Sequence, residues 1–374
     1  MAGIGSVSVD TYLAGLPSIA IAMDAPIERV QLSIGAFFMG IALAPLFYGP
    51  LSDRYGRVVV LCCGMFIFML AVVGCATSSR IDTFLAFRGL QGMGAGAASV
   101  LARATVRDLY GPLDSARMLS LIQAFTGVLP ILGPMGGGYL LLMGWRSAFW
   151  LMGGYGLLCL LAFVLLIKET RPNQGAQKHT NALKSYWQVL NDRSDVGYIL
   201  SGGASFAGLF AFVGGSSFVF IELYEFTPQR YGVLFSLAST GLIIGGYLGA
   251  YLIPRFGIRR MQVFESAICA TTGSAVFVLV RFGDANAFII LGLAWFYLAA
   301  MNAMAANSMA GMLARHAERA GAASALGGLA MFTCGALGVL LVSTLHDGTA
   351  IPLSAGMMLG GAAGFLAQWS LIRE

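Results

Sequence analysis

Apolar segments recur along the whole chain, each followed by a short polar loop. A helix crosses a hydrocarbon layer of roughly 30 Å with about 20 apolar residues, and these segments have that length. The pattern therefore predicts an all-α membrane protein with twelve transmembrane helices, near residues 2–22, 30–50, 58–76, 83–103, 117–142, 147–167, 197–221, 231–252, 261–281, 286–312, 321–344 and 350–372.

The longest polar stretch, residues 168–195, separates six of these segments from the other six. We expect two pseudo-symmetric six-helix bundles, residues 1–167 and 196–374, joined by a cytoplasmic linker, residues 168–195. Related loops support an internal repeat, since YGPLSDRYGRVVV follows the second segment and YLIPRFGIRRMQV follows the eighth. Parallel repeats of this kind are a recurrent architecture of transporters.

Composition agrees with this interpretation. The 374 residues are 58% hydrophobic and 10% charged, with a mean hydropathy of +0.80, values typical of a multi-span membrane protein. With a cytoplasmic N-terminus, sixteen of the 22 Lys and Arg residues fall in inner loops and five in outer ones, as the positive-inside rule requires. The net charge of +5 thus reflects topology and a lipid partner, not nucleic acid, and both termini are expected in the cytoplasm.

The residue pattern gives no indication of a catalytic site or a metal site. The six cysteines lie in apolar segments without metal-binding spacing, and the three histidines are far apart in sequence. No nucleophile and base pair is apparent, so we expect neither an enzyme nor a cofactor. The first segment lacks a basic region of the kind that opens a signal peptide. Only nine residues precede Asp10, which leaves open a longer natural N-terminus.

One motif carries a strong resemblance. GPLSDRYGRVVVL, residues 49–61, resembles the loop signature G-x-L-x-D-R-x-G-R-[KR]-x-x-L of the major facilitator superfamily, and only Val58 departs from it. The resemblance implies a charge relay at the inner surface that holds the halves together in the outward-open state. Glycines would let the loop turn tightly and approach a neighbouring helix. The motif and gating residues are Gly49, Asp53, Arg54, Gly56, Arg57 and Asp108.

Two further motifs extend the resemblance. RGLQGMGAGAA, residues 88–98, resembles the superfamily motif R-x-x-Q-G-x-G-A-A, whose Arg88 should face the cavity and not lipid. GVLPILGPMGGG resembles the G-P-x-x-G-G motif of antiporter branches, through Gly133, Pro134, Gly137 and Gly138. Such a helix can kink and pack tightly against a partner from the other half. Residues 227–237 and 307–328 look like the Bcr/CflA branch of drug/proton antiporters.

Asp10 lies inside the first apolar segment. Desolvation disfavours its ionised form and a nearby cation favours it, so such a carboxyl can gain and lose a proton. Bcr/CflA-type proteins carry a membrane-embedded acid at the matching position. We therefore hypothesise that Asp10 is the proton acceptor and that Arg88 modulates it or responds to substrate. The alternative is a structural role for Asp10, paired with a polar neighbour or near the membrane surface.

Other polar residues are weaker candidates for the substrate cavity. Amides in apolar helices bind ligands, and they also join helices to one another. Acidic residues next to loops are often solvated. The candidates are Gln91, Gln123, Glu222, Asn302 and Asn307.

The resemblance favours a proton-coupled multidrug exporter of small lipophilic antibacterials, working as a monomer in the bacterial inner membrane. Alternating access would be driven by the proton motive force. Two alternatives stay open at this point. One is an uptake symporter for a small nutrient, against which the G-P-x-x-G-G motif argues. The other is a non-transporting membrane receptor or inactive remnant.

Overall fold

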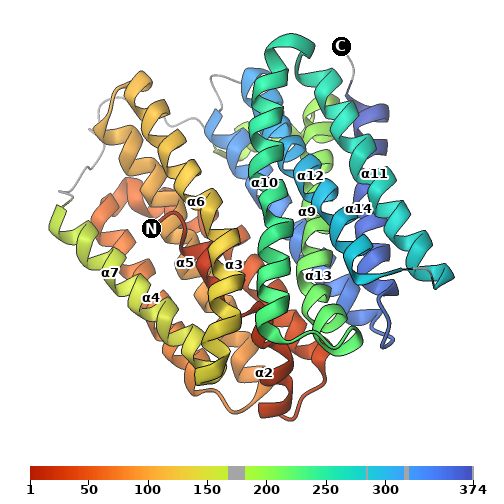
Figure 1. The fold of residues 1–374 in the computed structure, drawn as a ribbon. Helices are drawn as coiled ribbons and strands as arrows, with labels where there is room; N and C mark the ends of the chain where they lie inside the picture. Colours follow the sequence, from red (N-terminus) through yellow and green to blue (C-terminus); the bar gives the residue numbers. More distant parts are fainter. Residues whose placement is uncertain (167–181, 284, 316–319, 373–374) are drawn as a thin grey trace. The chain divides into compact units, whose positions relative to one another are not determined.

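The computed structural model describes residues 1–166, 182–283, 285–315 and 320–372, and these form helices with no strand among them (Figure 1). Half of the predicted linker, residues 168–181, lies outside these ranges together with Lys168, Arg171 and Lys178. Arg319 and Arg373, which the count of inner basic residues includes, also lie outside the described residues.

The chain divides into two compact units, and the first comprises residues 1–176 and 226–236. Its first predicted span is split into α1 (Ile4–Asp10), a 3₁₀ turn η1 (Leu13–Gly15) and α2 (Leu16–Ala22). The remaining elements of this unit are α3 (Ile27–Tyr55), α4 (Arg57–Thr77), α5 (Ile81–Leu109), α6 (Pro112–Leu140), η2 (Leu141–Met143) and α7 (Arg146–Leu166).

The second unit comprises residues 177–225 and 237–374. It begins with the short α8 (Ala182–Leu190), which is followed by the long helices. These are α9 (Arg193–Ser217) with its π-helical extension η3 (Phe218–Leu223), α10 (Pro228–Phe256), α11 (Ile258–Phe282), α12 (Ala287–Arg315), α13 (Ala320–Thr344) and α14 (Ile351–Leu371). The first turns of α10 belong to the first unit and the rest of the helix to the second.

The number of spans agrees with the hydropathy pattern. Among the described residues, eleven helical segments are long and apolar enough to cross a membrane. The remaining long helix, α5, has 29 residues, but Arg88, Gln91 and several glycines make its middle less apolar. Counting α5, the structure confirms the predicted all-α, twelve-helix architecture with two bundles.

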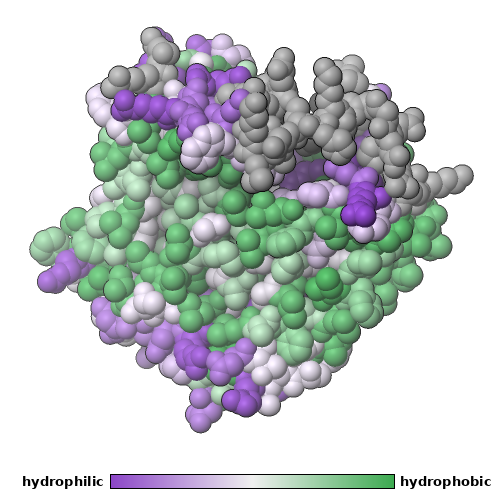
Figure 2. Space-filling view, turned by 180° about the vertical axis from the view of Figure 1, so that it is seen from behind, coloured by the Kyte–Doolittle hydropathy of each residue, from purple (hydrophilic) through white to green (hydrophobic). Residues whose placement is uncertain are grey.

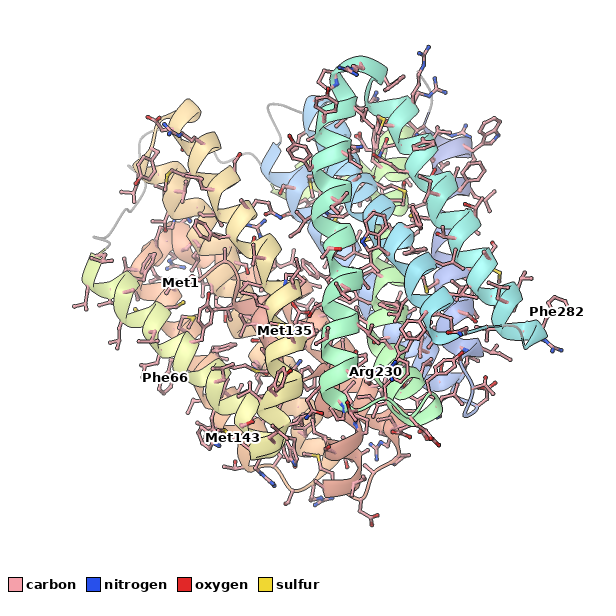
Figure 3. The ribbon with its side chains drawn as sticks, in the orientation of Figure 1. Met1, Phe66, Met135, Met143, Arg230 and Phe282 are labelled. Carbon is pink, nitrogen blue, oxygen red and sulfur yellow. The ribbon has the colours of Figure 1, made fainter. Side chains whose placement is uncertain are left out.

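Apolar side chains cover much of the surface, as lipid contact requires. Leu165, on α7, is 80% exposed, and Phe282, at the end of α11, is 75% exposed and projects away from its unit (Figure 3). Hydrophobic residues cover the middle of the face in Figure 2, and hydrophilic residues gather toward its ends. This distribution is inverted relative to a water-soluble protein of the same size.

The turn between α3 and α4 corrects one expectation. Gly56 has a φ of +100°, and Gly257, its partner in the repeat, has a φ of +79°, a region that glycine occupies at no steric cost. Gly49, however, lies inside α3, and a methyl group added there would meet nothing within 4 Å. The predicted tight-turn and close-approach role of Gly49 is therefore wrong, because the helix continues to Tyr55 and Gly56 alone forms the turn.

An acidic cap stabilises the beginning of α9 in the second unit. The Asp192 carboxylate accepts hydrogen bonds from the N–H groups of Ser194 and Asp195 at 2.8 and 3.3 Å. It also accepts one from the Arg315 guanidinium at 2.7 Å. Burial by itself raises the pKa of Asp192, but these hydrogen bonds and the guanidinium charge outweigh it and lower the pKa below its ordinary value. The cap therefore stays ionised at neutral pH and is lost only as acid protonates the carboxylate.

Candidate functional site

The first span breaks at the residues that the sequence singled out. The α-helix ends at Asp10, and the N–H of Tyr12 turns back to the carbonyl of Val9 in place of that of Ser8. An unbroken helix would have used the Ser8 carbonyl as the acceptor four residues back. A carbonyl freed in this way needs another donor, because hydrocarbon offers none.

Arg88 supplies that donor. Its Nη1 donates to the Ser8 carbonyl at 3.1 Å and to Oε1 of Gln91 at 2.6 Å. Arg88 is seven residues inside α5, which is about 10 Å from the beginning of the helix. The break in the first span is therefore inside the apolar layer and not at its edge.

Three aromatic rings surround the rest of this guanidinium. Its carbon lies 4.3 Å from the ring centroid of Tyr12 and 4.4 Å from that of Phe37, and the Phe149 centroid is 5.9 Å away. A desolvated cation–π contact contributes about 2 kcal/mol or more. Arg88 is fully buried, so it lies away from lipid, and its expected place at the cavity stays a prediction.

Asp10 and Arg88 lie on either side of the same helix break without forming a pair. Asp10 is half-buried, and within the described ranges no ion pair or hydrogen bond of its carboxylate is found. The Nε and Nη2 atoms of Arg88 are buried and likewise have no hydrogen-bond partner in the described part of the chain. The unit thus holds an acid and a cation near one helix break. Polar atoms of both side chains have no hydrogen-bond partner within the described residues.

The antiporter-like motif lies directly against Asp10. A Cβ atom added to Gly133 on α6 would come 2.5 Å from the Cβ of Asp10, and one added to Gly137 would overlap the carbonyl of Thr11. Hydrogen is the only side chain that fits at either place. The two glycines, one helical turn apart, therefore let α6 approach the broken segment at backbone contact distance.

The same motif also contacts the first turns of α10. Gln229 donates its Nε2 to the Gly138 carbonyl at 3.1 Å, and the Ser236 hydroxyl donates to the carbonyl of Ile131. A Cβ on Gly232 would overlap the carbonyl of Pro134. Met135 and Arg230 mark these two stretches in Figure 3. Within the first unit, α6 therefore packs tightly against the first turns of α10.

At the other end of the unit, Arg57 joins the two acids of the loop signature. Its Nη1 lies 2.7 Å from Oδ1 of Asp53, and its Nε lies 2.9 Å from Oδ2 of Asp108. The predicted three-residue relay therefore has the required geometry. All three residues belong to one unit, so this contact connects α3, α4 and α5. The relay was expected to hold the two halves together, whereas these two ion pairs lie within the first unit.

The three side chains of this relay differ in their exposed fraction. The side chains of Arg57, Asp108 and Asp53 are 9%, 22% and 44% exposed. We expect Arg57→Gln to lower the free energy of unfolding by about 3 kcal/mol, because it strands two acids around a buried position. Asp53→Asn should cost less than about 1 kcal/mol, as exposed pairs do, and Asp108→Asn should fall between them. Thermal unfolding of the three purified variants checks the order, and equal losses would contradict it.

The proposed cavity residues have different surroundings. Gln91 is buried and donates to the Met152 sulfur at 3.5 Å as well as accepting from Arg88. Asn302 donates to the Leu242 carbonyl at 2.7 Å, and Asn307 donates to Glu265. The side-chain donors of these three residues therefore join helices. Gln123 and Glu222 are exposed.

Sequence reasoning missed several residues that the fold brings into play. Ser8, Tyr12 and Phe37 complete the surroundings of Arg88, and nothing in their own apolar context marks them. Glu265, on α11, had the same signal as Asp10, an acid inside an apolar helix, and was overlooked.

Buried charge, a broken first span and two bundles of long apolar helices are typical of a membrane transporter. Comparison with known families gives the particular one: the model described as Major Facilitator Superfamily matches residues 1–339. The chain belongs to the major facilitator superfamily.

Similarity to individual proteins indicates the branch of the superfamily. An uncharacterized MFS-type transporter, YdgK of Bacillus subtilis, is 32% identical over 382 residues, covering 100% of this chain and 94% of that protein. A bicyclomycin resistance protein homolog of Haemophilus influenzae is 28% identical, covering 92% and 87%. The multidrug resistance protein MdtL of Salmonella paratyphi C is 27% identical, covering 94% and 88%. These relatives are consistent with the Bcr/CflA-type resemblance.

Solved structures agree on the fold. A D-xylose-proton symporter superposes with a TM-score of 0.79 at 18% identity, covering 100% of this chain and 97% of that one. A nucleoside transporter gives 0.71 at 13% identity, covering 99% and 98%. At these identities the likeness concerns architecture alone.

Proposed function

We propose that this protein is a proton-coupled exporter of small lipophilic compounds, antibacterials among them, in the bacterial inner membrane. The observation that carries the proposal is the contact between Asp10 and the glycines of the antiporter-like motif on α6. Relatives named for multidrug and bicyclomycin resistance support export as the direction and drugs as the cargo.

Asp10 is the proton acceptor in this proposal. The carboxyl takes up a proton when its site opens to the acidic outside and releases it when the site opens to the cytoplasm. A lipophilic cation near Asp10 stabilises the ionised form, so cargo and proton compete for one position. That competition couples the downhill movement of the proton to the uphill movement of the drug.

Arg88 has a positioning role. By binding the Ser8 carbonyl it holds the helix break open, and the break in turn sets where Asp10 meets α6. Its charge is fixed, since a guanidinium does not lose its proton in a protein. The transporter works as a monomer with both termini in the cytoplasm, and the proton gradient is its only energy source.

Inverted membrane vesicles test the direction of coupling. In vesicles whose lumen has been acidified by respiration, added ethidium or bicyclomycin should make the lumen more alkaline, because each cargo molecule that enters exchanges for protons. An uptake symporter would move proton and cargo in the same direction and give no alkalinisation. A receptor would bind the compounds and leave the lumen pH unchanged. Vesicles from cells lacking the protein are the control.

A further inference from the structure

A second acid is buried inside the other unit. Glu265 lies on α11, seven residues from Ile258 and so about 10 Å along the helix. It is 3% exposed, among the most buried charged residues of the described chain. None of the motifs discussed above includes it.

Its hydrogen bonds come from a neutral group. Nδ2 of Asn307, on α12, donates to both Oε1 and Oε2 of Glu265, each at 2.9 Å. The α10 backbone closes a further side, because a Cβ on Gly249 would lie 3.5 Å from Oε1. Within the described residues, no ion pair to Glu265 is found.

The surrounding helices carry few charges. Between residues 351 and 371, α14 has no charged residue, and the cation of α12, Arg315, is paired with Asp192 and Asp195. On α10, Arg255 donates to the hydroxyl of Tyr251. The other titratable or charged groups on helices packed around this site are Arg193 and Tyr198 of α9, Tyr247 of α10, Arg259, Arg260, Cys269 and Arg281 of α11, and Tyr297 of α12.

An ionised carboxylate in such a place is costly, because two hydrogen bonds from one amide do not replace water and no cation balances the charge. A protonated carboxyl, in contrast, needs an acceptor for its O–H. Oε1 of Gln262 is buried without a partner, while Nε2 of the same amide donates to the Ser308 hydroxyl at 2.9 Å. Residues three apart on a helix share a face, so Gln262, whose Oε1 has no hydrogen-bond partner among the described residues, lies on the same face of α11 as Glu265.

We propose that Glu265, bound by Asn307 and on the same helix face as Gln262, is a second proton-binding site of this transporter. Its carboxylate takes up one proton from water and, when water reaches it from the nearby inner ends of α11 and α12, returns one proton. This inference rests on the burial and hydrogen bonding of Glu265 and does not require that the protein export drugs.

Infrared difference spectroscopy of the full-length protein in lipid bilayers tests it without any cargo, because protonated and ionised carboxyl groups absorb in separate regions. Spectra at alkaline and near-neutral pH should show a buried carboxyl that gains a proton. Glu265→Gln should remove that component and leave the one from Asp10. Asn307→Leu keeps the volume but withdraws two hydrogen bonds, so the Glu265 component should move to higher frequency.

Glu222→Gln is the matched control. The same substitution at an exposed acid should leave the Glu265 component of the difference spectrum unchanged. The proposal is overturned if Glu265→Gln, shown to be folded by its unchanged thermal unfolding, has the wild-type difference spectrum. It is also overturned if the Glu265 component stays protonated at every pH, since such a group binds a proton without exchanging it. A transporter that failed the vesicle assay would leave this result unaffected.

Discussion

Asp10→Asn is expected to abolish proton-coupled export while the protein stays folded. Asparagine matches aspartate in shape and can neither take up nor release a proton, so lumen alkalinisation on adding ethidium should fall to the level of vesicles without the protein. Thermal stability should be unchanged or slightly raised, because a neutral amide costs less to bury than a carboxylate. Cells expressing this variant should lose any drug resistance that the wild-type protein confers.

Asp24→Asn provides the matched control. Asp24 lies just beyond the same span, is exposed, and has a φ of +46°, a conformation that asparagine tolerates well. Its substitution should leave transport at the wild-type level. Full proton-coupled transport by Asp10→Asn would exclude Asp10 as the proton acceptor.

The second large effect is expected at the glycines of α6. Gly133→Ala and Gly137→Ala each place a methyl group where the backbone or Cβ of the broken segment already lies. Overpacking of this kind costs about 1–3 kcal/mol, and it moves Asp10 away from its site. Because displacement of a reacting group by 1 Å can cost about 100-fold, we expect export to fall by at least about tenfold. Thermal unfolding and vesicle transport measure the two consequences.

Gly136 offers a control on the same turn of the same helix. A Cβ added at Gly136 meets nothing within 4 Å. Gly136→Ala should therefore leave transport intact and stabilise the helix by up to about 1 kcal/mol, through the higher helix propensity of alanine. Similar losses in all three alanine variants would mean that the motif needs flexible glycines and not close packing.

Local rules explain why the spans were predictable. The length of an apolar run and the charges beside it determine whether a segment crosses a bilayer, and these quantities are read directly from neighbouring residues. α5 illustrates the limit of such rules. The apolar pattern predicted a span near residues 83–103, yet α5 is not among the eleven described segments that are apolar enough by composition alone.

The candidate site was only partly predictable from the sequence, because its residues come from distant stretches of the chain. Arg88 and Ser8 are 80 residues apart, and no periodicity in either segment indicates that a guanidinium completes the hydrogen bonding of a broken helix. Likewise, Glu265 and Asn307 were two polar residues on separate spans until packing joined them. Which donor meets which acceptor depends on the rotation of each helix about its axis.

The amino-acid sequence alone therefore determined the number and placement of the membrane helices, the family motifs and the unusual acid in the first span. Hydrophobic length and residue spacing act within a single segment, so they need no partner to be recognised. The tertiary structure decided the rest: the break after Asp10, the aromatic surroundings of Arg88, the contact of Gly133 and Gly137 with the first span, and the burial of Glu265. These features depend on close packing between helices, and such contacts exist only once the chain has folded.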